Sequence, residues 1–317
     1  MTEPLRLFTL WGIDGYPFGL CIAIAVFLGT LLLIGTWRRH AALPWLGLRF
    51  ALYALPLGLV FSRLFYLVVR WRFLSVDYVE AFWYTLPLGG YSLAGSFAGI
   101  VTAAWLVARL GRRPMAEVLD MAAPAALLVL ACERLAECFT LDGVGLYVDN
   151  EALWHFPFAV LNPYGEYVMP VFFYEALTAF LIMGWLLYFL RKHMRAVGDV
   201  ALTAMLLLGL TQIFWESLRV DDYLRFGFVR VNQLWGALLA GIALGVWLKR
   251  SHPSRTRAVV VSAAFLVCIG VMVAVEFGQD KSTISNGILH AAMALALAGI
   301  GLMGVTLRNA CVRRTMA

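Results

Sequence analysis

The chain has 317 residues, of which 62% are hydrophobic and 14% are charged, and its mean hydropathy is +0.82. This composition excludes an ordinary soluble domain. The net charge of +6 does not indicate a nucleic-acid-binding protein, because the basic residues stand in short clusters between apolar runs. We therefore expect an all-α fold, a polytopic bundle of membrane helices.

Nine apolar runs have a length that spans a bilayer, about 18 to 25 residues. The predicted spans cover residues 16–36, 47–69, 91–110, 117–139, 170–190, 199–218, 231–248, 258–276 and 286–307. The first run reaches Trp37 without a small-residue cleavage signal, so we expect a retained helix rather than a signal peptide.

The charges of the loops predict an orientation. Basic clusters such as Arg38/Arg39 and Arg112/Arg113 occupy every second loop, whereas the alternate loops are acidic. By the positive-inside rule, the N-terminus lies outside and the C-terminus lies in the cytoplasm. The longest loop, residues 140–169, is then extracytoplasmic.

The five cysteines all lie in or beside apolar segments. They show no paired spacing in a loop, and no histidine stands near them at metal-ligand spacing. We therefore expect no disulfide, no metal and no cofactor.

With this orientation, polar residues of six successive spans fall in the outer half of the bilayer. The positions concerned are Arg63, Tyr66, Ser92, Glu133, Arg134, Glu137, Tyr174, Glu175, Gln212, Glu216, Arg219, Asn232 and Gln233. A charged side chain inside a membrane costs roughly 2.5 to 3.5 kcal/mol and suggests function. Two interpretations stay open: local ion pairs that each fasten two helices, and one polar cavity that opens to the outer side. The concentration in one leaflet favours the cavity.

The arginines favour an anionic ligand. Arg63 and Arg134, with Arg219 at the rim, suit a phosphate group, since a guanidinium matches two phosphate oxygens at once. A phospholipid that enters sideways from the bilayer fits such a cavity. Glu175 and Glu216 would act either as general bases or as partners that hold the arginines in place.

The segment Arg134–Gly145 resembles the motif Arg-Leu-Gly-Asn-Phe-Ile-Asn-Gly-Glu-Leu-Trp-Gly of the prolipoprotein diacylglyceryl transferase family, with Asp142 at the glutamate position. Residues 89–95 resemble the family's Gly-Gly-Met-Ser-Phe-His-Gly, and Arg63 with Tyr66 resembles Gly-Arg-x-x-Tyr. Further matches follow in the family's order at Phe18-Gly19-Leu20, Asp120, Phe156-Pro157, Pro170, Tyr174-Glu175, Glu216, Arg219 and Gln233. The resemblance covers roughly residues 12 to 250.

The resemblance implies an enzyme of the bacterial inner membrane with an extracytoplasmic cavity. It would move the diacylglyceryl group of phosphatidylglycerol to the thiol of a lipobox cysteine in a secreted precursor, releasing glycerol 1-phosphate. Arg134 would bind the phosphate and Asp142 would orient it or the head group, with Glu137, Glu175 and Glu216 as further catalytic candidates. The candidate lipid-binding residues are Arg63, Tyr66, Gly89, Gly90, Ser92, Gln212, Arg219 and Gln233.

Four positions depart from the family pattern. Ala94 stands in place of a histidine, Gln212 in place of an arginine, Met169 in place of a second histidine and Glu137 in place of an asparagine. Losing general acid–base assistance alone slows a reaction by about 10² to 10⁴-fold. Glu137 would supply a base or serve as an ion-pair partner of Arg134.

Two functions therefore stay open, a diverged transferase with the usual or another acceptor, and a non-catalytic phospholipid-binding protein or complex subunit. A transporter fits less well, because no charged residues continue into the inner half. We expect residues 1–250 to form the transferase-like domain. Residues 251–317 would add two transmembrane helices with a possible partner surface.

Overall fold

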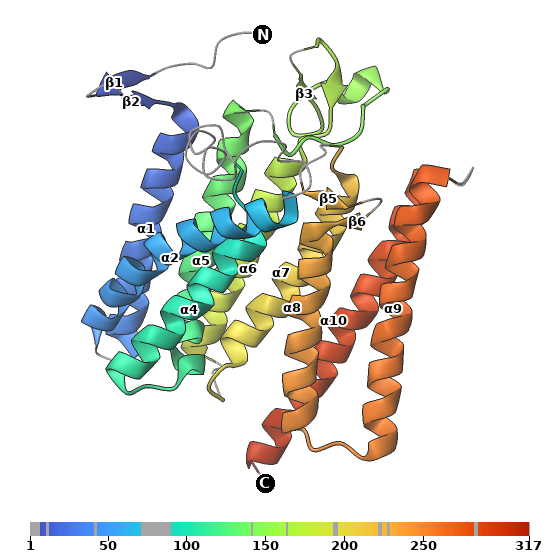
Figure 1. Cartoon of the computed structure of the whole chain (residues 1–317). Helices are drawn as coiled ribbons and strands as arrows, with labels where there is room; N and C mark the ends of the chain where they lie inside the picture. Colours follow the sequence, from blue (N-terminus) through green and yellow to red (C-terminus); the bar gives the residue numbers. More distant parts are fainter. Residues whose placement is uncertain are drawn as a thin grey trace. The chain divides into compact units, whose positions relative to one another are not determined.

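The computed structural model describes residues 7–10, 13–40, 43–70, 90–140, 142–162, 164–192, 196–220, 224–226, 229–281 and 285–316. Over these residues, nine helices are long and apolar enough to cross a membrane (Figure 1). They are α1 (Pro17–His40), α2 (Pro44–Arg70), α4 (Leu93–Gly111), α5 (Met115–Ala136), α6 (Val171–Lys192), α7 (Asp199–Leu218), α8 (Val231–Arg250), α9 (Arg255–Lys281) and α10 (Asn286–Met316). The predicted all-α membrane bundle is confirmed, whereas its orientation stays a prediction.

The helices agree with the predicted spans because one property, a long apolar run, decides both. The largest difference lies in α10, which continues from the predicted end at residue 307 to Met316. A span prediction stops at Arg308, the first charge, but arginine has good helix propensity and the helix does not have to stop there.

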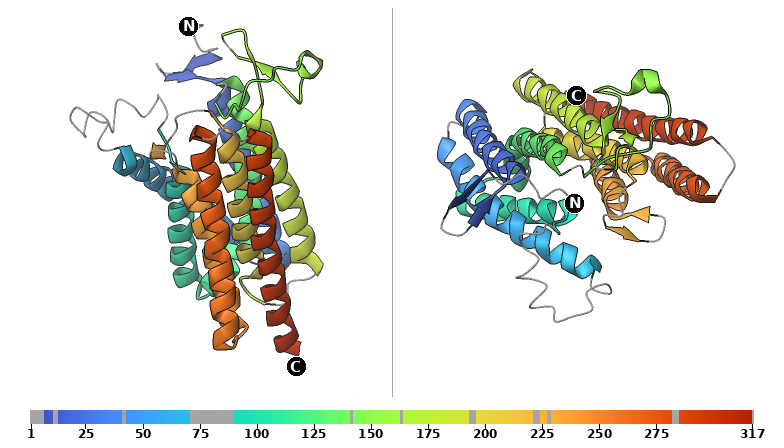
Figure 2. Two further views of the ribbon diagram at one scale, coloured as in Figure 1. Left: turned by 90° about the vertical axis from the view of Figure 1, so that its right-hand side faces the viewer. Right: turned by 90° about the horizontal axis from the view of Figure 1, so that it is seen from above.

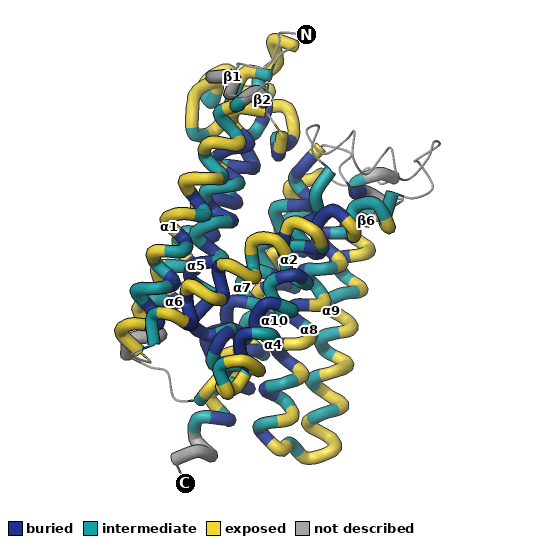
Figure 3. Tube along the Cα trace, turned by 60° about the vertical axis from the view of Figure 1, so that its left-hand side comes forward, coloured by how far each residue is buried: buried dark blue, intermediate teal, exposed yellow. Residues whose placement is uncertain are grey.

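Large apolar side chains cover the outer faces of several helices. Phe27, Leu181 and Leu302 are each more than 60% exposed, and exposed positions recur along α1, α2, α9 and α10, whereas no residue of α7 is exposed (Figure 3). Such apolar faces can contact lipid tails, while the backbone N–H and C=O groups are hydrogen-bonded within each helix. This surface fits a multi-pass membrane protein.

The chain forms two compact units, one of residues 30–122 and one of residues 1–29 with residues 123–317. In the first unit, α2 and α4 pack closely. A Cβ atom added to Gly95 would meet the backbone of Ser62, and one added to Gly99 would meet Gly58. These two glycines of α4 therefore allow the two helix backbones to touch.

The second unit contains helices α6 to α10, and α7 to α10 share one apolar core. Its tightest contact joins α7 to α8, where a Cβ atom added to Gly236 would lie 2.6 Å from the carbonyl oxygen of Gly209. The last two helices share the same core, since Met272 of α9 and Met293 of α10 belong to it together with Leu244 of α8 (Figure 2). The predicted domain boundary at residue 250 stays a prediction.

Short hairpins and turns lie between the helices. In the described residues, β1 (Phe8–Leu10) pairs with β2 (Ile13–Gly15), β3 (Val160–Leu161) with β4 (Tyr167–Val168), and β5 (Arg225–Phe226) with β6 (Val229–Arg230), all antiparallel. The turns η2 (Glu137–Phe139) and η3 (Glu151–Leu153) follow α5. The loop that contains β3 is tied to α6, because the Tyr174 hydroxyl donates to the Pro157 carbonyl at 2.9 Å.

Candidate functional site

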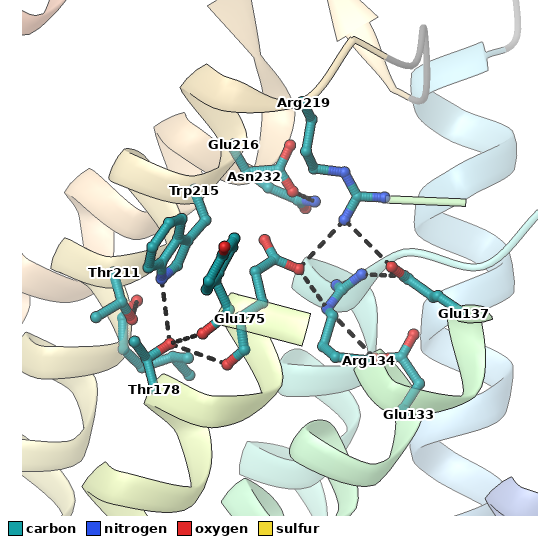
Figure 4. A network of polar contacts seen from close by, with 12 residues as sticks. Glu133, Arg134, Glu137, Glu175, Thr178, Thr211, Trp215, Glu216, Arg219 and Asn232 are labelled. Carbon is teal, nitrogen blue, oxygen red and sulfur yellow. Dashed lines mark hydrogen bonds and ion pairs between the residues drawn. The ribbon is translucent and has the colours of Figure 1, made fainter. Parts of the chain in front are cut away.

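Two arginines and two glutamates form a buried ring of ion pairs in the second unit (Figure 4). Arg134 Nε lies 3.1 Å from Glu175 Oε2, and Arg134 Nη1 also pairs with Glu137. Arg219 Nη1 lies 3.3 Å from Glu175 Oε2 and 3.7 Å from Glu137 Oε2. All four residues are buried. Each guanidinium therefore contacts both carboxylates, and we call this set the acid–arginine ring.

Four elements place these side chains: α5, η2, α6 and the end of α7. Arg134 lies in the last turn of α5 and Glu137 begins η2, three residues later, so the two lie on neighbouring turns. Gly143 then adopts a φ of +68°, and a Cβ atom there would meet the Glu137 carboxylate and the side chain of Phe172. The absence of a side chain at residue 143 thus leaves room for Glu137.

The backbone after Gly143 joins the start of α6 to the end of α7. The Gly143 carbonyl accepts from Phe172 N at 2.8 Å, and the Val144 carbonyl accepts from Val220 N at 3.1 Å. Gly145 also forms an isolated β-bridge with Arg219. The segment that resembles the family motif therefore fixes the two helix ends that present Glu175 and Arg219.

A direct contact between the side chains of α6 and α7 also helps to hold Glu175 in place. The Thr178 hydroxyl donates to the Glu175 carbonyl at 2.9 Å and accepts from Trp215 Nε1 at 3.1 Å (Figure 4). The Trp215 ring also stacks on Tyr174, with centroids 5.5 Å apart. These contacts hold the first turns of α6 in place relative to α7.

Helix α8 extends the ring through Glu216. Asn232 Nδ2 donates to Glu216 Oε1 at 2.6 Å, and Arg230 Nη1 lies 3.9 Å from Glu216 Oε2. Arg230 Nη2 also donates to the Arg219 carbonyl at 2.5 Å. Five elements, α5, η2, α6, α7 and the start of α8, therefore contribute to one network.

The charges of this network leave no positive surplus. Counting Glu133, which lies 3.5 Å from Arg134 and is partly exposed, four carboxylates face three guanidinium groups. Burial alone would lower the pKa of Arg219, but Glu137, Glu175 and Glu216 outweigh it and raise that pKa above its ordinary value, so the guanidinium stays charged. An incoming phosphate must therefore compete with carboxylates for the arginines.

Three buried acceptor oxygens near this network have neither a hydrogen bond nor an ion pair among the described residues: Glu175 Oε1, Gln212 Oε1 and Asn232 Oδ1. All three belong to residues that are at least 93% buried. Glu137 Oε2 also lacks a hydrogen bond, but it pairs with Arg219. Buried acceptor oxygens normally accept a hydrogen bond, so a ligand or a water molecule is expected to donate one to each of the three unpaired oxygens. The site is therefore suited to a ligand with hydroxyl groups as well as an anionic group.

A separate polar cluster lies in the first unit. Arg63 Nη1 donates to the Gly90 carbonyl at 2.8 Å, and its guanidinium lies 5.6 Å from the Tyr66 ring centroid and 5.8 Å from that of Tyr91. Gly90 has a φ of +86°, and a Cβ atom there would meet Arg63 and Tyr66. Ser92 joins the same turn, because its N–H donates to Ser62 Oγ at 2.7 Å.

The predicted site residues fall into three groups. Arg134, Glu137, Glu175, Glu216 and Arg219 meet in one network, and Gln233 joins it through a hydrogen bond from Arg230 N at 3.1 Å. Arg63, Tyr66, Gly90 and Ser92 meet in the first unit, whereas Gly89 lies outside the described residues. Gln212 is buried in α7 near Glu216, and Asp142 is exposed with no ion pair to the described residues of the network.

The network includes two residues that the sequence-based set of site residues omitted. Arg230 lies just before an apolar span, where a charged residue is as consistent with a loop as with a functional site. Asn232 was recognised only as a polar residue at the start of a span. Because Arg230 and Asn232 both contact Glu216, the start of α8 belongs to the site.

The fold and the network together define a polytopic membrane protein with a buried site of paired acids and arginines. Residues 6–249 match the model of the prolipoprotein diacylglyceryl transferase family. The chain belongs to this family, as the motif around Arg134 predicts.

Curated relatives agree with this assignment. The chain is 26% identical over 260 residues to the phosphatidylglycerol–prolipoprotein diacylglyceryl transferase of Pediococcus pentosaceus, which covers 79% of this chain and 91% of the relative. It is 26% identical to the enzyme of that name from Finegoldia magna, over 77% of this chain and 95% of the relative. It is 27% identical to the one from Clostridioides difficile, over 77% and 95%. Helices α9 and α10 lie beyond the matched residues 6–249.

Proposed function

We propose that this chain transfers the diacylglyceryl group of phosphatidylglycerol to the cysteine thiol of a prolipoprotein. The single observation that carries the proposal is the acid–arginine ring, which is built on the family motif and lies within the residues that match the family. The names of the relatives supply the substrates.

The reaction requires one bond to break and one to form. The thiolate sulfur attacks the glyceryl carbon, and the electron pair of the carbon–oxygen bond leaves with the phosphate oxygen of glycerol phosphate. The thiol proton passes to a base. Charge on the leaving phosphate therefore needs a fixed cation, and the thiol needs a nearby proton acceptor. Arg134 fits the first requirement and a carboxylate of the ring fits the second.

The closed ring suggests how binding and proton transfer are linked. A phosphate that reaches Arg134 takes a guanidinium N–H away from Glu137 or Glu175, since both carboxylates already occupy this arginine. The displaced carboxylate loses its ion pair in a buried place and becomes available to accept the thiol proton. A carboxylate base also fits Ala94, where the family pattern has an imidazole and this chain has none.

The unpartnered acceptors support a hydroxylated head group. Gln212 Oε1 and Asn232 Oδ1 can each accept a hydrogen bond from a glycerol hydroxyl. A lipid whose head group has no hydroxyl makes neither of these two hydrogen bonds and leaves both oxygens to water. This agrees with phosphatidylglycerol as the donor.

The test is transfer from labelled phosphatidylglycerol in vesicles to a lipobox peptide. Wild type should transfer the label, and Arg134→Ala should lower the rate by about 10² to 10³-fold, as for loss of one group that stabilises a leaving oxyanion. Arg113→Ala is the matched control, because Arg113 is an exposed arginine that pairs only weakly with Glu117, at 3.4 Å. Equal transfer by wild type and Arg134→Ala would overturn the proposal.

One observation favours a second function, a phospholipid-binding protein without transferase activity: every guanidinium of the network is already paired. In that case wild type gives no transfer, yet phosphatidylglycerol vesicles raise its melting temperature more than that of Arg134→Ala. Absence of both transfer and this difference would exclude both functions.

We also propose that the loop around β3 lies on the extracytoplasmic side of a bacterial cytoplasmic membrane. The exposed residue Tyr164 offers a test. In intact cells, a membrane-impermeant maleimide should label Tyr164→Cys well above the wild-type background and should not label Arg113→Cys above it. The reverse result would invert the orientation.

A further inference from the structure

We propose that Glu276 of helix α9 is a positioning residue that holds the first turn of α8 and, through it, Arg230 and Asn232 at Glu216. This proposal rests on the proposed transferase function. Residue 276 lies beyond residues 6–249, which match the family model. The added helices would thus be part of the catalytic unit rather than an appendage.

The link between α9 and α8 is a direct hydrogen bond. Gln233 Nε2 donates to Glu276 Oε1 at 2.6 Å. The other end of the same amide is also occupied, because Gln233 Oε1 accepts from Arg230 N at 3.1 Å. Gln233 is only 5% exposed. With both ends of its amide engaged, its rotamer and the first turn of α8 are fixed together.

Two residues on either side of this amide reach the site. Arg230 donates to the Arg219 carbonyl at 2.5 Å and lies 3.9 Å from Glu216, and Asn232 donates to Glu216 at 2.6 Å. A shift of the first turn of α8 lengthens all three contacts at once. The hydrogen bond from Gln233 to Glu276 therefore acts on the network through the backbone of α8.

The support itself is rigid. Met272 and Val275 of α9 and Leu289 and Met293 of α10 belong to the same apolar core as α7 and α8. Glu276 follows Val275 directly, so its backbone is anchored one residue away from a buried position. Glu276 accepts a hydrogen bond from a buried amide, and a bond to a charged acceptor is stronger than one between neutral groups.

Five variants test the inference, with vesicles of phosphatidylglycerol and a lipobox peptide as substrates. Glu276→Leu removes the acceptor, and we expect kcat to fall by about 10-fold, equivalent to about 1.4 kcal/mol, with KM for the lipid unchanged. Glu276→Gln keeps an acceptor oxygen and should stay within about threefold of wild type. Gln279→Leu is the matched control, because Gln279 Nε2 on the same helix has no hydrogen-bond partner in the described part of the chain.

A swap of the pair separates positioning from mere loss of folding. Gln233→Glu places two carboxylates face to face and should lower kcat more than Glu276→Leu does. The double variant Gln233→Glu/Glu276→Gln restores a donor opposite an acceptor and should recover most of the activity. Equal kcat for Glu276→Leu and Gln279→Leu, or no recovery in the double variant, would overturn the inference.

A readout without turnover separates this inference from the proposed function. The Arg230 amide donates to Gln233, so its hydrogen exchange reports the first turn of α8. In a peptide that covers residues 225–236, where the Arg230 amide lies beyond the first amides that lose their label by back-exchange, exchange should speed up in Glu276→Leu and not in Gln279→Leu. If wild type shows no transfer, the function fails while this result still decides the positioning role, and unchanged exchange would contradict that role.

Discussion

The two ends of helix α7 carry buried acids with different surroundings. Asp199 at its start pairs with one arginine, Arg250, at 3.4 Å, and accepts from Trp247 Nε1 at 3.3 Å. Arg250 is 36% exposed, so water shares its charge. Glu216 at the other end meets Asn232 and Arg230, which are both buried, beside the acid–arginine ring.

The difference shows how to tell a structural ion pair from a candidate site in a membrane helix. At the start of α7, one acid and one partly exposed arginine form a single ion pair that joins α7 to α8. At the other end, several buried acids and arginines come from several helices. The free energy needed to desolvate them all is larger than that of the single ion pair that is enough to join two helices. The excess of buried charge, rather than the presence of charge, marks the end of α7 that carries the site.

Removal of a carboxylate that both arginines share should have the largest effect on the difference between the two ends of α7. Glu175→Leu leaves Arg134 and Arg219 with fewer partners in a buried place, and we expect a loss of about 3 to 5 kcal/mol in the free energy of unfolding. Denaturation in detergent micelles measures it, together with loss of transfer. A loss below that of Asp199→Asn, measured in parallel, would contradict the assignment of the two ends.

Gly143→Ala tests the space that Glu137 occupies. A side chain at φ +68° costs about 1 to 2 kcal/mol, and here the Cβ atom also meets the Glu137 carboxylate. Gly165→Ala is the control, because Gly165 has a φ of +82° with nothing within 4 Å of an added Cβ. Transfer should fall in Gly143→Ala and stay near wild type in Gly165→Ala; equal effects would show that only backbone strain matters.

Gln212→Arg sharpens the comparison by changing the charge of the site. The network has one carboxylate more than it has guanidinium groups, so an added cation at this buried position should favour phosphate binding. We expect the transfer rate to rise by about 10-fold at limiting lipid. A decrease would mean that the Gln212 amide itself is needed by this chain, and Gln212→Leu would then be impaired as well.

Asp199→Asn should have the smallest effect. The amide still offers an oxygen to Trp247, and the half-exposed Arg250 can turn to water, so the expected loss of stability is about 0.5 to 1 kcal/mol. Transfer should stay within about threefold of wild type. A tenfold loss of transfer would show that the two ends of α7 are coupled.

The fold could be predicted from the sequence because long apolar runs define all nine helices of the described residues, although their ends, above all that of α10, differ from the predicted ones. Part of the site could be predicted as well, since Arg134 and Glu137 are neighbours on one helical path and Glu216 and Arg219 on another. The motif predicts a role for Asp142 as well; Asp142 is exposed, and its role stays a prediction.

Other features depend on packing that no local pattern specifies. Mutual neutralisation of the arginines depends on how four helix ends are rotated toward one another. The hydrogen bond between Gln233 and Glu276 joins residues from two different spans, and the sequence of neither span predicts that the two residues meet. The single common cavity predicted for all six helices stays a prediction.

The contact between Gly209 and Gly236 has a consequence for the whole site. These two positions lie two turns before Glu216 on α7 and one turn after Asn232 on α8, and their main chains touch. The distance between α7, which holds Glu216, and α8, which holds Asn232, is therefore the smallest that two helix backbones allow. A single methyl group at either glycine would push the two helices apart, whereas most substitutions at neighbouring positions would leave the distance between the helices unchanged.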